Sequence, residues 1–176
     1  NLEDAIDILR KTGIAKARKK SDRSAKEGLV FPYIHPGSKL GVLLEINCET
    51  DFVANTDDFK DLCKDISMHI AASAPMSVTR EEISSDVLDR EKAIYADQAR
   101  QSGKPENIIE KMTEGRLNKF YQENVLVEQS FVKDPDKTVN DLITETVAKL
   151  GENIIISRFS RFQLGEKVNN SAPTEN

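Results

Sequence analysis

Two short runs of strand-forming residues, joined by a five-residue turn, constrain the fold of this sequence more than any other feature. Residues 29–34 and 40–47 are rich in aliphatic, β-branched and aromatic side chains, and residues 35–39 between them read His-Pro-Gly-Ser-Lys. This pattern predicts a β-hairpin. Alternate residues of the second run share one apolar face, and Pro32 cannot donate a ladder hydrogen bond, so the first run is expected at a sheet edge or a bulge.

Helical periodicity fills most of the chain between this hairpin and a third strand predicted at residues 154–164. Apolar residues recur there at three- and four-residue spacing in four separate stretches. The predicted helix starts are Asn55 or Thr56, a capping box of Thr79 and Glu82, Pro105, and Thr138. The order strand, strand, helices, strand predicts an α+β fold, in which an antiparallel sheet of about three strands is covered by helices.

The part of the sequence before the hairpin divides into an apolar helix and a basic segment. Leu2 to Leu9 show helical spacing, and Thr12-Gly13 is a typical helix end. We expect residues 1–12 to be the last helix of a small helical domain that is incomplete here, and residues 13–27 to be a basic linker. The α+β core is expected over residues 28–166. The polar residues 167–176 lack periodicity and are expected to form a disordered tail.

Positive charge is concentrated near the start of the chain. Residues 10–26 hold eight Lys and Arg and one carboxylate, Asp22, although the whole chain has a net charge of −5. This segment is either the solvated face of a linker helix or a patch that touches RNA or an acidic protein. The acidic remainder argues against binding of polyanions by the whole surface.

Motif content argues against an enzyme, a nucleotide-binding protein and a membrane protein. The sequence has no Walker A motif, no G-x-G-x-x-G, and no apolar run approaching the roughly 20 residues that span a bilayer. An acid-base cluster of Asp51, Glu49 and His35 is the weak enzymatic alternative. We therefore expect no cofactor, no direct nucleotide binding and no membrane contact.

The remaining histidine, cysteines and strand arginines have ordinary structural interpretations. Cys48 and Cys63 are too few for a disulfide framework, and with the histidines they lack the spacing of zinc ligands. His69 lies near an apolar helical stripe and is expected to be a hydrogen-bonded histidine in or beside the core. Arg158 and Arg161 are expected at solvent-facing positions of the third strand.

One polar turn with a large apolar ring in its middle follows the second strand. Residues 48–55 read Cys-Glu-Thr-Asp-Phe-Val-Ala-Asn, with Asp51 and Phe52 expected at a loop tip. In one interpretation Asp51 caps the next helix and Phe52 packs back as a hydrophobic staple. In the other, the pair is presented to a partner by a rigid strand and helix, as aromatic hot-spot residues often are.

The sequence around this turn closely resembles the signature of the elongation factor Ts family. The signature covers residues 45–55, Glu-Ile-Asn-Cys-Glu-Thr-Asp-Phe-Val-Ala-Asn. Further matching stretches span nearly the whole chain before the tail: residues 13–17, 68–72, 102–105, 110–116, 129–132 and 162–166. The resemblance implies a three-helix ubiquitin-associated-like domain, of which residues 2–9 would be the third helix, followed by an α+β core. The chain is similar to the short members with one core subdomain, which are homodimers.

The resemblance also implies a function without a chemical step of its own. Members of this family are guanine-nucleotide exchange factors for the GTPase elongation factor Tu, acting in the bacterial cytoplasm or in the plastid stroma or mitochondrial matrix. Asp51 and Phe52 match the pair that enters the GTPase near its magnesium and phosphate site, and His35 matches a contact to its third domain. The partner-binding residues implied in this way, with their immediate neighbours, are Tyr33, His35, Thr50, Asp51, Phe52, Val53 and Asn55.

Overall fold

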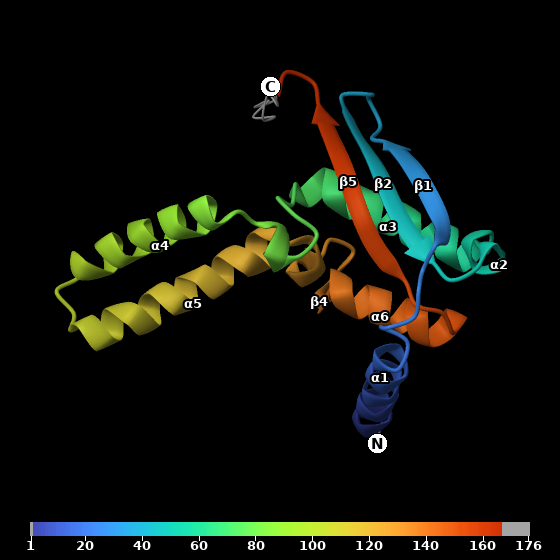
Figure 1. Ribbon diagram of the computed structural model, residues 1–176, viewed down its shortest axis with the longest axis horizontal. Coiled ribbons are helices and arrows are strands. Elements are labelled where there is room, and N and C mark those ends of the chain that lie inside the picture. Colours follow the sequence, from blue (N-terminus) through green and yellow to red (C-terminus); the bar gives the residue numbers. More distant parts are fainter. Residues whose placement is uncertain (1, 167–176) are drawn as a thin grey trace.

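A three-stranded antiparallel sheet, with helices against one face, is the basis of the fold in the computed structural model, which describes residues 2–166 (Figure 1). Its strands are β1 (Glu27–Ile34), β2 (Leu40–Cys48) and β5 (Ile155–Gln163), in the order β1-β2-β5. The predicted hairpin and third strand are therefore confirmed, and Pro32 lies on an edge strand as expected. The α+β prediction is confirmed as well.

The helices are arranged on one face of the sheet and beside it. Their bounds are α1 (Leu2–Arg18), α2 (Asp51–Ala54), α3 (Asp57–Ser73), α4 (Ser85–Arg100), α5 (Glu106–Asn124) and α6 (Val139–Leu150). Short 3-10 helices occupy Arg80–Glu82 and Leu126–Glu128, and a small second sheet pairs β3 (Ser130–Phe131) with β4 (Asp134–Thr138). The second sheet was not predicted, because its strands are too short to show an alternating pattern. Among residues 2–166, no helix combines the length and the apolar character needed to cross a bilayer.

The main core lies between one face of the sheet, α3 and α6. Alternate residues of β2 point into it, and Leu44 and Ile46 are completely buried against Phe59 and Ile66 of α3. The N-caps predicted for α3 and α6 are confirmed: Thr56 Oγ1 accepts from the Phe59 N–H, and Thr138 forms a capping box with Asp141. These caps fix where each helix begins relative to the sheet.

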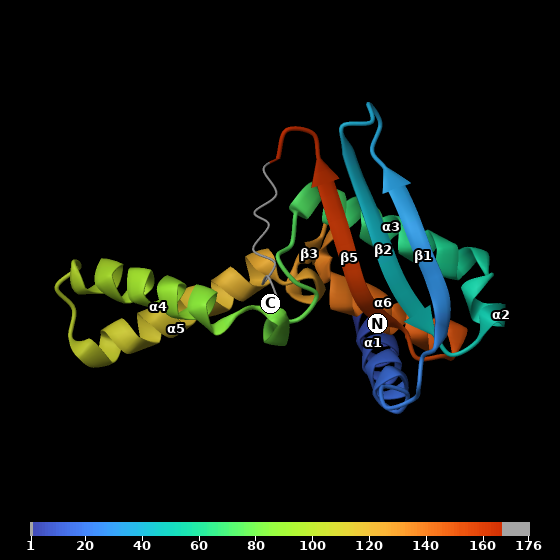
Figure 2. The same ribbon diagram turned by 45° about the horizontal axis from the view of Figure 1, so that its top comes forward.

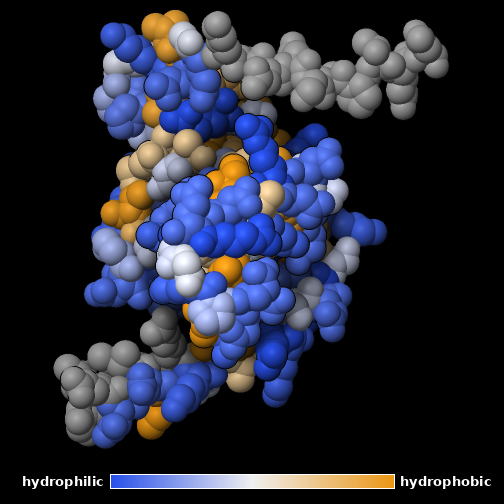
Figure 3. Space-filling model, turned by 90° about the vertical axis from the view of Figure 1, so that its left-hand side faces the viewer, coloured by the Kyte–Doolittle hydropathy of each residue, from blue (hydrophilic) through white to orange (hydrophobic). Residues whose placement is uncertain are grey.

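Helices α4 and α5 pack on each other and project from the core as a hairpin (Figures 1 and 2). A second small core of Ile83, Phe120 and Val125 holds the base of this hairpin. Figure 3 views the molecule from the hairpin side, and that face is largely hydrophilic. The capping box predicted for Thr79 and Glu82 is wrong: the Glu82 carboxylate instead accepts from the Val78 N–H, at 2.9 Å, and α4 begins only at Ser85.

The first helix does not end at Gly13, as predicted, but continues to Arg18. A Cβ at Gly13 would lie 3.7 Å from Ala148 Cβ of α6, an ordinary packing distance, so α1 continues through this position and packs on α6 there. The cations Lys16 and Arg18 lie in its last turn, where they interact favourably with the helix dipole. Assignment of residues 1–12 to a separate domain stays a prediction, and the predicted tail, 167–176, lies outside the described residues.

The two strand arginines lie in different environments. Arg158 is exposed, as predicted, and its Nε donates to the Glu45 carboxylate at 2.7 Å. The prediction for Arg161 is wrong: its side chain is only 14% exposed and donates to the Ala71 carbonyl of α3. Two residues three positions apart in a strand point to opposite faces, so both arginines could not face solvent on the same side.

Candidate functional site

Asp51 and Phe52 form the start of the short helix α2, at the end of strand β2. Both side chains are exposed, and Phe52 is 81% exposed, the highest value among the exposed large hydrophobic residues described. The N-cap is Thr50, whose Oγ1 accepts from the Val53 N–H, rather than Asp51. The interpretation in which Asp51 is the cap and Phe52 a staple is therefore wrong, and the pair lies in a helical turn rather than in an open loop.

Glu152 holds the backbone immediately before this pair. Its Oε2 accepts from the N–H groups of Glu49 and Thr50, each at 3.0 Å, and its Oε1 accepts from the Thr50 hydroxyl at 2.6 Å. The Glu49 side chain in turn binds the residue after Glu152: its Oε1 accepts from the Asn153 N–H at 2.7 Å. Hydrogen bonds to a carboxylate are stronger than those between neutral groups, so this reciprocal set fixes the turn firmly.

A third segment, just after α1, completes the support of the turn. Asn153, which is buried, donates from its side-chain amide to the carbonyls of Ser21 and Arg23, at 3.2 and 2.8 Å. The Lys20 ammonium donates to the Gly151 carbonyl at 2.6 Å. Arg23 lies 3.6 Å from the Glu49 carboxylate. We call residues 20–23, 49–50 and 151–153 together the support network.

The far side of the turn is fixed by the core itself. Val53 is half-buried and packs against the main core, and Ala54 is buried in it. The Asn55 side-chain amide donates to the Asp51 carbonyl at 2.9 Å. Cys48 is fully buried beneath the turn, and its thiol donates to the Thr50 carbonyl at 3.1 Å. Burial and the nearby Glu152 charge raise the pKa of this thiol above its usual value, so it stays protonated at neutral pH.

Tyr33 and His35 lie at the opposite end of the sheet, where β1 turns into β2. The Tyr33 hydroxyl and His35 Nδ1 are 3.0 Å apart, and the His35 N–H donates to the Leu40 carbonyl. The register pairs Glu27 with Cys48 near α2 and Ile34 with Gly41 near the hairpin turn, so the two groups lie at opposite ends of a strand about 23 Å long. This separation suits contact with a large partner and not a small molecule.

The residues predicted for the site therefore fall into two groups. Thr50, Asp51, Phe52, Val53 and Asn55 are brought together in one turn, with only Asp51, Phe52 and Asn55 exposed. The enzymatic alternative, which needed Asp51, Glu49 and His35 together, is contradicted by the position of His35. Among residues 2–166, no cluster of three His, Cys, Asp or Glu has the arrangement of a metal site.

His69 is a buried structural histidine, as predicted. Its Nδ1 accepts from the Val132 N–H at 3.2 Å, so Nε2 carries the proton and donates to Gln129 Oε1 at 2.8 Å. Burial lowers the pKa of this imidazole below its usual value. The side chain links α3 to the residues on both sides of β3, away from the exposed pair.

Comparisons with known proteins agree with the sequence signature. The family model described as elongation factor Ts matches residues 11–166. An elongation factor Ts of Geobacter sulfurreducens is 58% identical over 166 residues, covering 94% of this chain and 77% of that protein. Those of Syntrophobacter fumaroxidans and a Thermoanaerobacter species are 53% and 54% identical, covering 95% and 98% of this chain and 84% of each relative. The chain therefore belongs to the elongation factor Ts family, and its role lies in translation elongation.

Proposed function

We propose that the chain is a guanine-nucleotide exchange factor that binds elongation factor Tu in its GDP form and promotes GDP release. The observation that carries the proposal is the position of Phe52, a large ring held almost fully exposed on a turn fixed from both sides. Burying such a ring on a partner contributes about 2 kcal/mol. A partner that binds the turn gains this free energy by enclosing the ring against its own apolar side chains.

The chemistry of the exposed pair suits a site that contains a magnesium ion and phosphates. Magnesium demands near-octahedral geometry, so a small displacement of its surroundings loosens its hold on the phosphates. The ring of Phe52 would wedge between elements of the GTPase, while the Asp51 carboxylate enters the same region. The factor itself makes and breaks no covalent bond and does not hold the nucleotide.

His35 and Tyr33 provide a second contact under this proposal. A partner that reaches both ends of the sheet is positioned by two points at opposite ends of a strand about 23 Å long, given the register of β1 and β2. Two contacts on one rigid sheet fix the orientation in which Phe52 enters. We expect a His35→Ala variant to weaken binding of elongation factor Tu while leaving the protein folded, because the side chain is exposed.

Exchange activity makes a thermodynamic demand that can be measured. If this chain lowers the affinity of elongation factor Tu for GDP by a certain ratio, GDP must lower the affinity of elongation factor Tu for this chain by the same ratio. Calorimetric titration of the chain into elongation factor Tu, with and without GDP, gives one ratio, and GDP titration with and without the chain gives the other. Equal ratios above tenfold support the proposal, while GDP-independent binding contradicts it.

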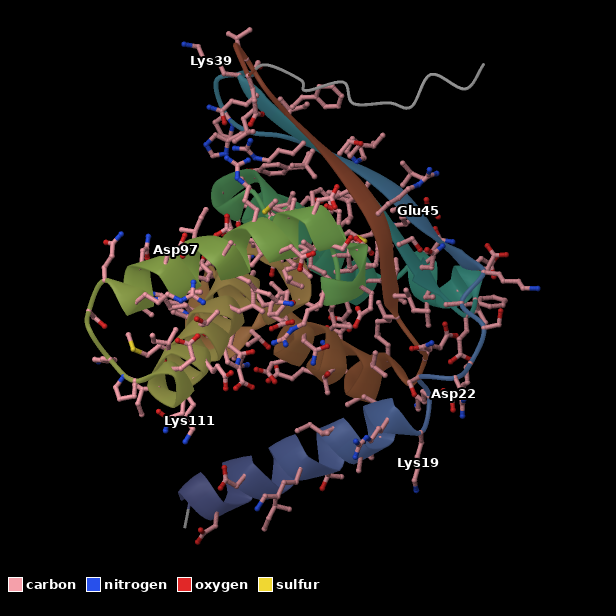
Figure 4. The ribbon with its side chains drawn as sticks, turned by 60° about the vertical axis from the view of Figure 1, so that its left-hand side comes forward. Lys19, Asp22, Lys39, Glu45, Asp97 and Lys111 are labelled. Atoms are coloured by element: carbon pink, nitrogen blue, oxygen red, sulfur yellow. The ribbon has the colours of Figure 1, made fainter. Side chains whose placement is uncertain are left out.

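We also propose that the chain forms a homodimer through the outer face of the sheet, which the helices leave uncovered. Val30, Ile34, Leu43 and Phe162 are exposed there, around a hollow of about 260 Å³ that Val30 and Leu43 help to line. Glu45, labelled in Figure 4, lies on this face too, away from α3. Such an apolar patch on a monomer is typical of an association surface.

Sedimentation at micromolar concentration tests the dimer. The unsubstituted chain should sediment with twice its monomer mass, and Leu43→Lys should sediment as a monomer because a charge would be buried in the interface. Ile94→Lys, at an exposed residue of α4, is the matched control and should remain dimeric. A monomeric unsubstituted chain contradicts this part of the proposal.

The bacterial source of the relatives makes us expect the protein in the bacterial cytoplasm.

A further inference from the structure

The end of α1 and the segment after it carry the strongest charge concentration in the protein. Residues 10–26 have a net charge of +7, so the rest of the chain has a net charge of −12. A remainder that is acidic on balance disfavours binding of polyanions by the surface as a whole. The charge is thus a local feature and not a property of the composition.

Five of these cations are free to meet a ligand. Lys11, Lys16, Arg18, Lys19 and Lys26 are exposed, and within the described part of the chain none of them forms an ion pair. We call these five residues the basic face. By contrast, Lys20 and Arg23 are engaged in the support network.

The basic face is held rigidly, because the other side of α1 packs on the protein. Gly13 approaches Ala148 of α6, and Ala17 packs against the main core. Lys11 and Arg18 are seven residues apart, which places their Cα atoms on the same side of the helix about 10 Å along the axis. Figure 4 shows Lys19, at the end of α1, pointing away from the rest of the molecule.

The shape and chemistry of this face favour a phosphate backbone over a protein or a lipid surface. A shallow groove along it is lined by Lys11, Ile14, Ala15, Arg18 and Lys19, and residues 10–26 contain no aromatic residue. Protein interfaces depend on buried aromatic or apolar anchors. A membrane-surface helix needs a broad apolar face, but here the opposite side of α1 packs on α6. The exposed large apolar residues in the described part of α1 are Ile8 and Ile14, of which only Ile14 lines the groove, so the face offers a protein partner little apolar surface. Distributed cations need no larger anchor to bind nucleic-acid phosphates.

We propose that the basic face binds RNA through its phosphate backbone, without base specificity. Translation elongation places such a protein among RNA, which is the abundant polyanion of that setting. The site is distinct from the turn of residues 48–55, since none of its five cations belongs to the support network or to the residues around Phe52. It would keep the factor near RNA-bound components while the turn remains available to its partner.

Fluorescence anisotropy with a labelled 20-base-pair RNA duplex tests the proposal. Contact with about four phosphates predicts a slope of roughly −3 to −4 in log affinity against log salt, or about a hundredfold weaker binding between 50 and 200 mM salt. The triple variant Lys11→Glu, Lys16→Glu, Lys19→Glu should lose at least tenfold in affinity. Thermal melts and stimulated GDP release of this variant should match those of the unsubstituted chain, which separates this test from that of the exchange activity.

The matched control changes the net charge equally at exposed lysines elsewhere. Lys92→Glu, Lys104→Glu and Lys111→Glu, on and between α4 and α5, should leave RNA affinity within twofold. Equal losses in both triple variants would show that net charge alone acts and would overturn the proposal. Three other results would also overturn the proposal. These are RNA binding that does not depend on salt, binding of a DNA duplex of the same sequence at least tenfold more tightly than the RNA, and binding of phosphatidylserine vesicles in place of RNA.

Discussion

Removing the Glu152 carboxylate should destabilise the protein and also reduce the proposed exchange activity, although Glu152 itself lies beneath the proposed contact residues. Glu152→Ala deletes three hydrogen bonds, from the N–H groups of Glu49 and Thr50 and from the Thr50 hydroxyl. A hydrogen bond to a charged group contributes about 1.5–3 kcal/mol when it is well buried. The Glu152 side chain is only half-buried, and water can replace part of the loss. We therefore expect a loss of about 2–3 kcal/mol in the free energy of unfolding.

Two assays measure this effect. Urea unfolding gives the change in the free energy of unfolding directly, and the melting temperature should fall by about 5–10 °C for a chain of this size. Hydrogen exchange measured by NMR should show faster exchange at the amides of Glu49 and Thr50. In the stopped-flow assay of GDP release from elongation factor Tu, we expect about a tenfold lower second-order rate constant, because the turn that presents Phe52 is less ordered.

The controls separate support of the turn from general stability. Glu152→Gln keeps the shape of the side chain but lacks the charge, and one of its two terminal atoms no longer accepts, so its effects should be intermediate. Thr138→Ala removes the N-cap of α6 and should cost about 1 kcal/mol without changing exchange. If Glu152→Ala loses stability but stimulates GDP release normally, the support network does not position Phe52. If neither quantity changes, the hydrogen bonds contribute nothing measurable and the reasoning is refuted.

Three further predictions concern single residues. Phe52→Ala should change the free energy of unfolding by less than about 0.5 kcal/mol, since the ring is exposed; a loss of several kcal/mol on urea unfolding would show that the ring packs on its own protein. Because the pKa of His69 is lowered in the folded state, its contribution to stability should be complete above pH 6.5 and decline as the pH falls below it. The difference in melting temperature between pH 7.5 and 5.5 should therefore be smaller in His69→Gln than in the unsubstituted chain, and an unchanged difference would contradict a neutral buried His69. Gly28→Ala should lower the free energy of unfolding by about 2 kcal/mol or more, because φ of Gly28 is +142° and a Cβ would lie 2.2 Å from the Ile46 carbonyl oxygen. An unchanged melting temperature would show that the strand relaxes easily.

The sheet and the starts of α3, α5 and α6 were predictable because their signals are local. Alternation in the second strand identifies its buried face, and Thr56 and Thr138 are caps recognisable from a few neighbouring residues. The errors have physical reasons as well. Gly13 has the sequence of a helix end, but packing against Ala148 on a distant helix overrides that local preference.

The candidate site was predictable only in part. The exposed pair Asp51 and Phe52 lies in a short stretch with a recognisable signature, so sequence identified it directly. The contacts of Glu152 and Asn153 join positions about a hundred residues apart, and no local pattern marks such partners. The only sequence hint was the helix end at Gly151, which places the next residues in a turn where their side chains can reach other segments.

The rate at which fluorescent GDP leaves elongation factor Tu, measured by stopped flow with Phe52→Ala and with Met76→Ala, tests the central claim most directly. Met76 is a second exposed apolar residue, at 54%, and lies outside the turn of residues 48–55. Loss of about 2 kcal/mol of ring burial corresponds to roughly a thirtyfold lower rate constant for stimulated release with Phe52→Ala, while Met76→Ala should match the unsubstituted chain. Undiminished stimulation by the Phe52→Ala chain would contradict the account.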